Sequence, residues 1–154
     1  PPLPPERQLG GKALSWAVYF NWKNQSEAIQ LLLLLNADPN YAPSSSAEAP
    51  LHTAAIRGCF TAAALLLQAG AAVNQRGPGS YTPLAFAVAG RHADLAELLL
   101  TFGADPDLQG KNGSPRSLAL EGRSYRIWRL ISEASPRMMR LCGTSSPSPS
   151  PSSS

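Results

Sequence analysis

The stretch that decides the fold is "APLHTAAIRG", residues 49–58. It returns in altered form as "TPLAFAVAGR" at residues 82–91 and as "SPRSLALEGR" at residues 114–123. The prolines of the three stretches are 33 and 32 residues apart. A period of this length is typical of solenoids, in which one small supersecondary unit is repeated and stacked on itself.

A second landmark, a leucine run with a turn after it, follows the same period. "LLLLLNADPN" ends at Asn40, "LLLQAGAAVN" at Asn74 and "LLLTFGADPD" at Asp107, so these ends are 34 and 33 residues apart. Because two separate landmarks share one spacing, the sequence predicts an internal repeat.

Each unit predicts two short helices and a connector. Thr82 and Ser114 are N-cap residue types followed by proline at the first helical position. The helix after this proline should end near Gly58, Gly90 or Gly122, where a left-handed backbone is easily adopted. A second helix should then bury an apolar stripe. The predicted stripes are Ala62, Ala63, Leu66 and Leu67; Leu95, Ala96, Leu99 and Leu100; and Ile127, Trp128 and Ile131.

The glycines near the helix ends are not in one register. Gly90 and Gly122 come one residue earlier in their units than Gly58 does, and each is followed by arginine. Two outcomes stay open: the first helix of these units ends one residue sooner, or Arg91 and Arg123 lie in a strained turn.

The period, the TPLH-type opening, the alanine and leucine pairs and the G-A-D-x-N ending together resemble the ankyrin repeat over about residues 12–133. The resemblance implies an all-α solenoid of stacked helix-turn-helix units with projecting hairpin loops. Repeats are expected at about 12–40, 49–74, 82–107 and 114–133, the first and last atypical because end units have one neighbour. Counting back from Asn36 puts Trp16 at the proline position and Asn24 at the left-handed turn.

The composition changes outside and within this region. Residues 1–11 begin "PPLPPE" and are predicted to form a flexible N-terminal tail. Residues 134–154 are rich in serine and proline and are predicted to be a disordered tail. The stretch 41–48 should lengthen the first hairpin, which we expect to be irregular or mobile.

The totals favour a binding module over an enzyme. Charged residues make up 15% of the chain and the net charge is +3, less basic than a committed nucleic-acid binder. Cys59 and Cys142 lack zinc or disulfide spacing, and the chain contains no phosphate loop or catalytic serine motif. We therefore expect no enzyme activity, no cofactor and no small-molecule substrate. The start has no apolar signal segment, which favours the cytoplasm or the nucleus.

The polar side chains that invite a catalytic interpretation have structural alternatives. The resemblance implies that the TPLH histidine bonds neighbouring backbone and ties one unit to the next, so His52 is predicted to be structural, as is His92. Asp38, Asp105 and Asp107 should lie at hairpin corners, where carboxylates bond nearby amides.

The resemblance implies a non-catalytic protein–protein interaction module, a scaffold or adaptor that presents a concave groove to a protein or peptide. The candidate partner-binding residues are Trp22, Lys23, Tyr41, Ile56, Arg57, Gln75, Arg76, Tyr81, Ala89, Gln109, Lys111, Asn112 and Glu121. Aromatic residues and arginine are common interface anchors, so Trp22, Arg57, Arg76 and Tyr81 rank first. Basic candidates outnumber acidic ones, which favours an acidic or phosphorylated partner segment. We expect the domain to be monomeric.

Two alternatives concern the C-terminal region. Arg123, Arg126 and Arg129 recur every three residues, which suits either a solvated helix face or a basic surface for nucleic acid or acidic membrane. "SPRMMRLC", residues 135–142, resembles the start of a suppressor-of-cytokine-signalling box and implies a ubiquitin-ligase substrate adaptor. The next residues, "GTSSPSPS", lack the apolar helix that such a box needs.

Overall fold

The computed structural model describes residues 5–20, 23–45 and 47–141, and they form helices that follow one another in pairs. The pairs are α1 (Pro5–Tyr19) with α2 (Gln25–Leu34), α3 (Pro50–Arg57) with α4 (Phe60–Gln68), α5 (Pro83–Ala89) with α6 (Ala93–Thr101), and α7 (Pro115–Glu121) with α8 (Tyr125–Leu141). The described residues contain no strand, only an isolated bridge between Gly110 and Gly113. The predicted all-α class is confirmed.

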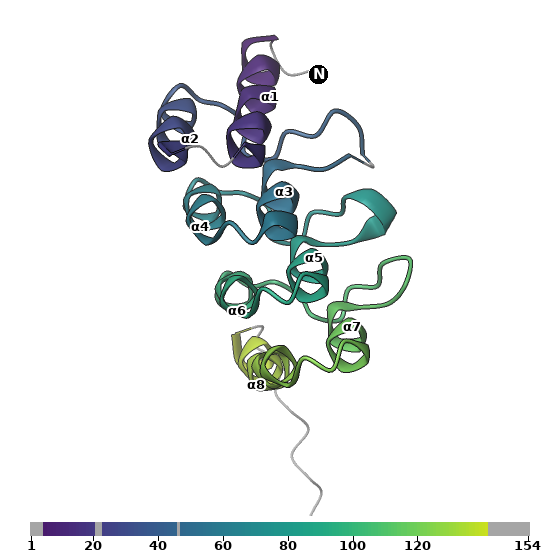
Figure 1. Ribbon diagram of the computed structural model, residues 1–154. Helices are drawn as coiled ribbons and strands as arrows, with labels where there is room; N and C mark the ends of the chain where they lie inside the picture. The colour runs from purple at the N-terminus through teal and green to yellow at the C-terminus, as the bar shows by residue number, and fades with distance from the viewer. Residues whose placement is uncertain (1–4, 21–22, 46, 142–154) are drawn as a thin grey trace, which may run out of the picture.

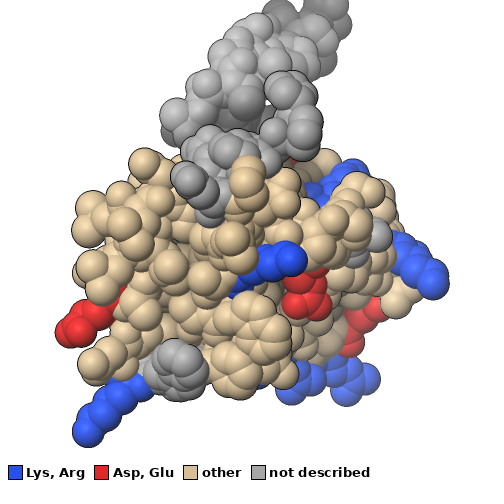
Figure 2. Space-filling view, turned by 90° about the horizontal axis from the view of Figure 1, so that it is seen from above, with Lys and Arg blue, Asp and Glu red and all other residues tan. Residues whose placement is uncertain are grey.

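The helix pairs stack into a solenoid. Figure 1 shows α1, α3, α5 and α7 in one column, α2, α4, α6 and α8 in a second, and the loops between pairs projecting from the first column. Helices contact their neighbours along each column and within each pair. The end of the stack formed by α1 and α2 carries few charged side chains (Figure 2).

The predicted caps begin two of the inner helices. The Thr82 side chain accepts a hydrogen bond from the Ala85 amide at 3.4 Å, and Ser114 accepts one from the Ser117 amide at 3.3 Å. Each satisfies an amide that the first turn of a helix leaves unpaired.

Both outcomes that the positions of the glycines left open are present: α5 and α7 end one residue sooner, and the arginine after each glycine is left-handed. Gly58 is left-handed with φ +69° and closes α3. Gly90 and Gly122 stay right-handed, so α5 and α7 end sooner, and Arg91 (φ 60°) and Arg123 (φ 50°) take the left-handed conformation instead. A non-glycine residue pays a steric penalty there.

The core is one continuous cluster that runs through the stack. The stripes of α4 and α6 are buried as predicted, except that Leu100 is half-buried. In α8, Ile127 and Ile131 are fully buried, whereas Trp128 is 36% exposed because no further helix pair covers it in the described part of the chain.

Helix α1 begins earlier than the sequence indicated. Residues 5–11, expected to be a tail, are helical from Pro5 onward. Proline is well suited to the first position of a helix. Gly10 and Gly11 lie inside the helix and let it approach the next segment closely: a Cβ on Gly10 would lie 3.1 Å from the Ala37 Cβ, and one on Gly11 would collide with Tyr41. Glycine here serves packing and does not mark a linker. At the other end α8 continues to Leu141, so residues 134–141 are also helical, against expectation.

The first repeat has a different internal register from the one predicted. Leu14 and Val18 are fully buried, as Leu51 and Ala55 are in α3, so these pairs are equivalent. Trp16 therefore lies inside α1 and not at its start, and α1 ends at Tyr19. Asn24 is not left-handed (φ −114°). The segment that joins α1 to α2 is longer than that between α3 and α4, and counting back a fixed period missed this.

The loops that join the pairs are similar in length, spanning residues 35–49, 69–82 and 102–114. The expected lengthening of the first hairpin is therefore slight. It has no β-bridge in its described residues, whereas the third loop has the bridge between Gly110 and Gly113.

Candidate functional site

The inner helices and the loops beside them form the face that the sequence analysis assigned to partner binding. Tyr19, Ile56, Ala89 and Glu121 occupy equivalent positions at the ends of α1, α3, α5 and α7, and all four are exposed. We call this row of residues, together with Trp16 and Arg57, the inner face. Its character changes along the stack, from aromatic at α1 to acidic at α7.

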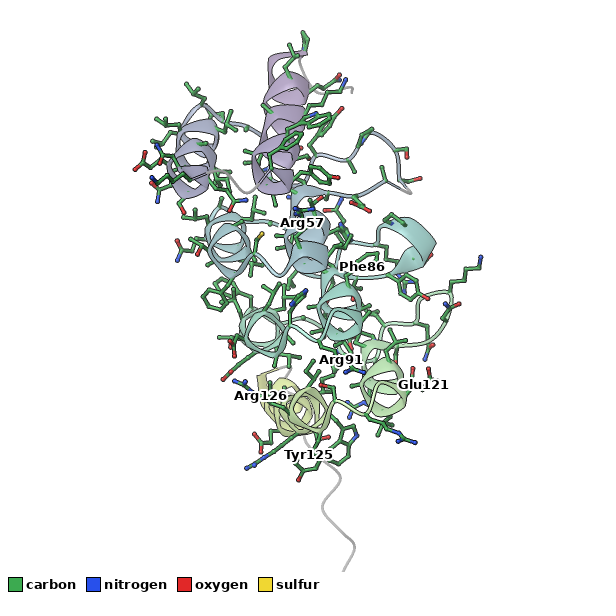
Figure 3. All side chains as sticks on the ribbon, in the orientation of Figure 1. Arg57, Phe86, Arg91, Glu121, Tyr125 and Arg126 are labelled. Atoms are coloured by element: carbon green, nitrogen blue, oxygen red, sulfur yellow. The ribbon has the colours of Figure 1, made fainter. Side chains whose placement is uncertain are left out.

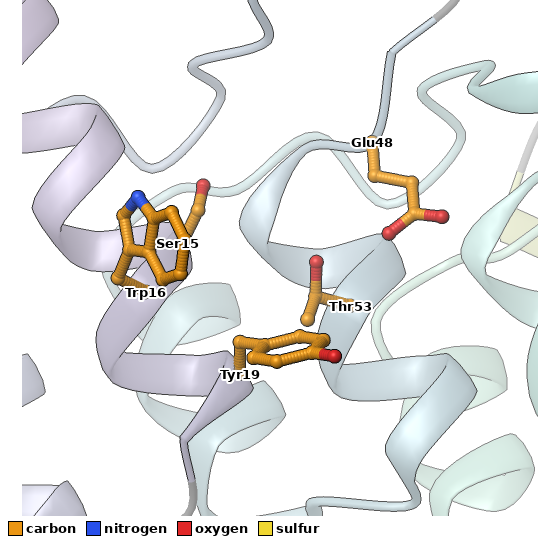
Figure 4. Close-up of a pocket in the computed structure, with 5 residues that line it drawn as sticks. All are labelled: Ser15, Trp16, Tyr19, Glu48 and Thr53. Atoms are coloured by element: carbon orange, nitrogen blue, oxygen red, sulfur yellow. The ribbon is translucent and has the colours of Figure 1, made fainter.

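A pocket of about 340 Å³ opens at the aromatic end of the inner face. Ser15, Trp16 and Tyr19 of α1, Thr53 of α3 and Glu48 of the preceding loop line it (Figure 4). Trp16 is 59% exposed and Tyr19 is 49% exposed. Large apolar side chains this exposed are typical of binding surfaces.

Arg57 lies at the border between α1 and α3 (Figure 3). Its guanidinium carbon is 4.8 Å from the centroid of the Tyr19 ring, a cation–π contact. Arg57 has no ion pair among the described residues.

The register of α1 decides which residues of the first repeat lie on the inner face. Because Leu14 and Val18 correspond to Leu51 and Ala55, Tyr19 is the equivalent of Ile56. The candidates Trp22 and Lys23 were placed by the other register. Lys23 is exposed in the turn before α2, and Trp22 lies outside the described residues.

Several candidate loop residues tie the loops to one another. The Gln75 side chain donates to the Asn40 carbonyl at 3.3 Å. The Tyr81 hydroxyl accepts a hydrogen bond from the Asn112 amide at 2.8 Å, and its ring packs edge-on to Phe86 at 5.7 Å between centroids. Gln75 and Tyr81 are half-buried and therefore belong to the frame as well as to the surface.

The remaining candidates lie on or near the loops. The Arg76 guanidinium donates to the Gln109 carbonyl at 2.8 Å, and both residues are exposed. Lys111 is also exposed. Tyr41 is half-buried against Gly11, so it seals the first loop onto α1.

The histidine of the opening motif is structural, as predicted. His52 is fully buried, its Nδ1 accepts from the Ala49 amide at 3.2 Å, and its Nε2 is 2.9 Å from the Gln75 carbonyl. These bonds require a neutral ring with the proton on Nε2. Burial lowers the pKa of His52, although hydrogen bonds to backbone carbonyls partly oppose this. His92 likewise reaches the Ile56 carbonyl, at 3.4 Å.

The aspartates act within the loops. Asp38 and Asp105 accept hydrogen bonds from the amides of Asn40 and Asp107, each at 2.9 Å, as turn-capping carboxylates do. Asp107 also forms a two-bond ion pair with Arg116, at 2.6 and 3.1 Å. The hydrogen bond from Arg116 lowers the pKa of the Asp107 carboxyl.

Two of the three arginines that recur at the start of the C-terminal region have an acidic partner, whereas Arg123 is exposed and has no ion pair among the described residues. Arg126 pairs with Asp94 at 2.8 Å and Arg129 with Glu133 at 2.8 Å. These contacts weaken the case for a basic surface that binds nucleic acid or membrane. Of the box-like segment 135–142, residues 135–141 continue α8 and Cys142 lies outside the described residues.

The described residues contain no group of three or more histidine, cysteine, aspartate or glutamate side chains that could hold a metal ion. None of the described helices has both the length and the apolar character needed to cross a membrane.

Sequence reasoning missed most of the aromatic end of the inner face. Trp16, Tyr19, Glu48 and Thr53 were not candidates, although all line the pocket. The four-residue spacing of Leu14 and Val18, matched to Leu51 and Ala55, was the signal that would have set the register and placed Tyr19 on this face.

Comparison with known proteins agrees with this architecture. The family model for ankyrin repeats (three copies) matches residues 10–110. Similar proteins include the ankyrin repeat and LEM domain-containing protein 1 homolog of Caenorhabditis elegans (36% identity over 106 residues, 64% of this chain and 15% of that protein). The human 2-5A-dependent ribonuclease is 47% identical over 64 residues, 40% of this chain and 9% of that protein.

A shorter relative is human protein phosphatase 1 regulatory subunit 27, which is 35% identical over 65 residues, 42% of each chain. The chain thus spans less than half of the length of any of these relatives. The family match covers well over half of this chain and coincides with the stacked helix pairs. The chain therefore belongs to the ankyrin-repeat family, whose repeats are generally protein–protein interaction modules and generally not catalytic.

Proposed function

We propose that this protein is a non-catalytic scaffold or adaptor whose inner face binds a segment of another protein. The observation that carries the proposal is the row of exposed side chains at equivalent helix ends, next to a pocket with two exposed aromatic rings. Half-exposed tryptophan, tyrosine and arginine side chains on a rigid frame are the usual anchors of protein interfaces.

The basic side chains at the end of α3 and on the loops beside the inner face support a partner segment that carries carboxylate or phosphate groups. Arg57, Arg76 and Lys111 are exposed and have no ion pair among the described residues. Asp107, the acidic group nearest in sequence to Lys111, is already paired with Arg116. An anionic segment would therefore meet unpaired positive charge, which favours encounter and orientation.

The test is to capture partners from cell lysate with the 154-residue chain and to compare three forms of it. The inner-face variant Ile56→Ser/Arg57→Ala changes two exposed side chains at the end of α3. The matched control Glu97→Gln/Thr101→Ala changes two exposed side chains on α6, in the other column of helices.

We expect the wild type and the control to retain a common set of proteins. The inner-face variant should bind these proteins at least about tenfold more weakly, a loss of about 1.4 kcal/mol in binding free energy. The melting temperatures of all three forms should agree within a few degrees, because the changed side chains are exposed. If the α6 control lost the same proteins while the inner-face variant kept them, the partner surface would lie on the outer helices and the proposal would be wrong.

A further inference from the structure

The pocket between α1 and α3 has a chemical character that the rest of the inner face lacks. Its lining consists of two aromatic rings, two hydroxyl groups and one carboxylate, and includes no lysine or arginine. Glu48 is exposed and has no ion pair among the described residues. Figure 4 shows the Glu48 carboxylate on the side of the pocket opposite the Trp16 ring. The pocket therefore offers electron-rich groups from several directions.

The two rings are held in place by contacts outside the pocket. Trp16 stacks on Phe20 with centroids 5.3 Å apart and planes 11° apart, and it meets Tyr19 edge-on at 6.4 Å. Tyr19 carries the Arg57 guanidinium over its ring. Trp16 and Tyr19 line the pocket whereas Phe20 and Arg57 do not, and about half of each of these two residues stays open to an incoming group. Rings already fixed in this way lose little entropy on binding.

We propose that this pocket binds a basic side chain, arginine or lysine, from the partner segment; the inference rests on the proposed function and adds the chemistry of one position in the partner. A cation is attracted by the faces of tryptophan and tyrosine and by the Glu48 carboxylate at the same time. An acidic side chain would be repelled by the Glu48 carboxylate. An aliphatic side chain would displace water from that carboxylate and offer no hydrogen bond in return.

Arg57 favours an acidic residue beside the inserted basic one. Its guanidinium is next to Tyr19 but outside the pocket, and it lacks an ion pair in the described structure. An acidic residue adjacent to the basic one would reach Arg57 and reduce the repulsion between the two cations. The partner segment should thus run from a basic residue at α1 toward acidic residues at α3 and the later loops.

The test uses N-acetyl-argininamide and its neutral isostere N-acetyl-citrullinamide, titrated into the ¹⁵N-labelled 154-residue chain. The measured signal is the indole Nε1–H resonance of Trp16, assigned by its loss in Trp16→Phe. We expect the arginine compound to shift this resonance with a half-saturating concentration on the order of 50 mM, as a weak exposed cation site should. The citrulline compound should produce less than about a fifth of that shift, because it lacks the charge.

Glu48→Gln should weaken binding of the arginine compound about two- to fivefold, the effect of losing one exposed ion pair. Glu121→Gln, which removes the exposed carboxylate at the end of α7, should leave it unchanged. Equal shifts with both compounds, no shift, or no effect of Glu48→Gln would overturn the inference. If the chain captures partners through its inner face but does not bind N-acetyl-argininamide, this inference is wrong and the proposed function stands. If it binds N-acetyl-argininamide but captures no partner through its inner face, the proposed function alone is wrong.

Discussion

His52 shows how a single residue joins the repeats. Its ring is fully buried and spans from the Ala49 amide to the Gln75 carbonyl, which belongs to the next loop. Burial holds the pKa of this imidazole below its ordinary value of 6.5 in the folded protein. In the unfolded chain the His52 imidazole has the ordinary pKa. Below about pH 6.5 the unfolded state therefore binds a proton at His52 that the folded state does not yet bind. The contribution of His52 is therefore fully present above this pH and falls as the pH drops.

We predict that the free energy of unfolding, measured by urea denaturation, is smaller at about pH 5 than at about pH 7.5. His52→Gln should lower stability at the higher pH and reduce the difference between the two. His92→Gln is the matched control: it removes the other histidine of the chain, leaves the buried His52 in place and should keep most of that difference. A pH dependence unchanged by His52→Gln would show that another group is responsible.

Helices α4 and α6 are the elements whose apolar stripes connect the middle of the stack. Leu66 and Leu99 are both fully buried in the shared core. Truncating either to alanine removes buried surface and leaves a cavity that packed neighbours fill only in part. We predict that Leu66→Ala and Leu99→Ala each lower the free energy of unfolding by about 2–5 kcal/mol in urea titrations.

Leu34→Ala is the control for these changes, because Leu34 ends α2 with 78% of its surface exposed. The same loss of side chain there should change stability by no more than about 0.5 kcal/mol. Similar losses at Leu34 and Leu66 would mean that α2 is covered in solution by something outside the described structure.

At the scale of the whole molecule, the 33-residue period predicted the stack because each repeat meets the next in the same way. It failed where one repeat departs from that spacing. The segment between Tyr19 and Gln25 is longer than its counterpart in the second repeat. Counting back by a fixed period therefore assigned Trp16 and Tyr19 to the wrong positions of the repeat. Glu48 was not a candidate, and the contact of Tyr81 with Gly110 was not predicted, because these contacts join segments that no local pattern relates. The helices were thus predictable, and the pocket between two of them was not.

The end of the stack formed by α7 and α8 should be less stable than the middle of the stack. Leu120 is 58% exposed, whereas its equivalent in α5, Val88, is 3% exposed; Trp128 is 36% exposed and its equivalent, Ala96, is fully buried. Stability in repeat proteins is close to a sum over neighbouring contacts, and in the described residues α7 and α8 contact a helix pair on one side only. We predict that amide hydrogen exchange, followed by mass spectrometry, is faster in α7 and α8 than in α3 to α6. Ile131→Ala should speed exchange in α7 and α8 far more than in α3 and α4, whereas Leu66→Ala should speed it in all of these helices. Equal acceleration everywhere by Ile131→Ala would show that the stack unfolds as one cooperative unit.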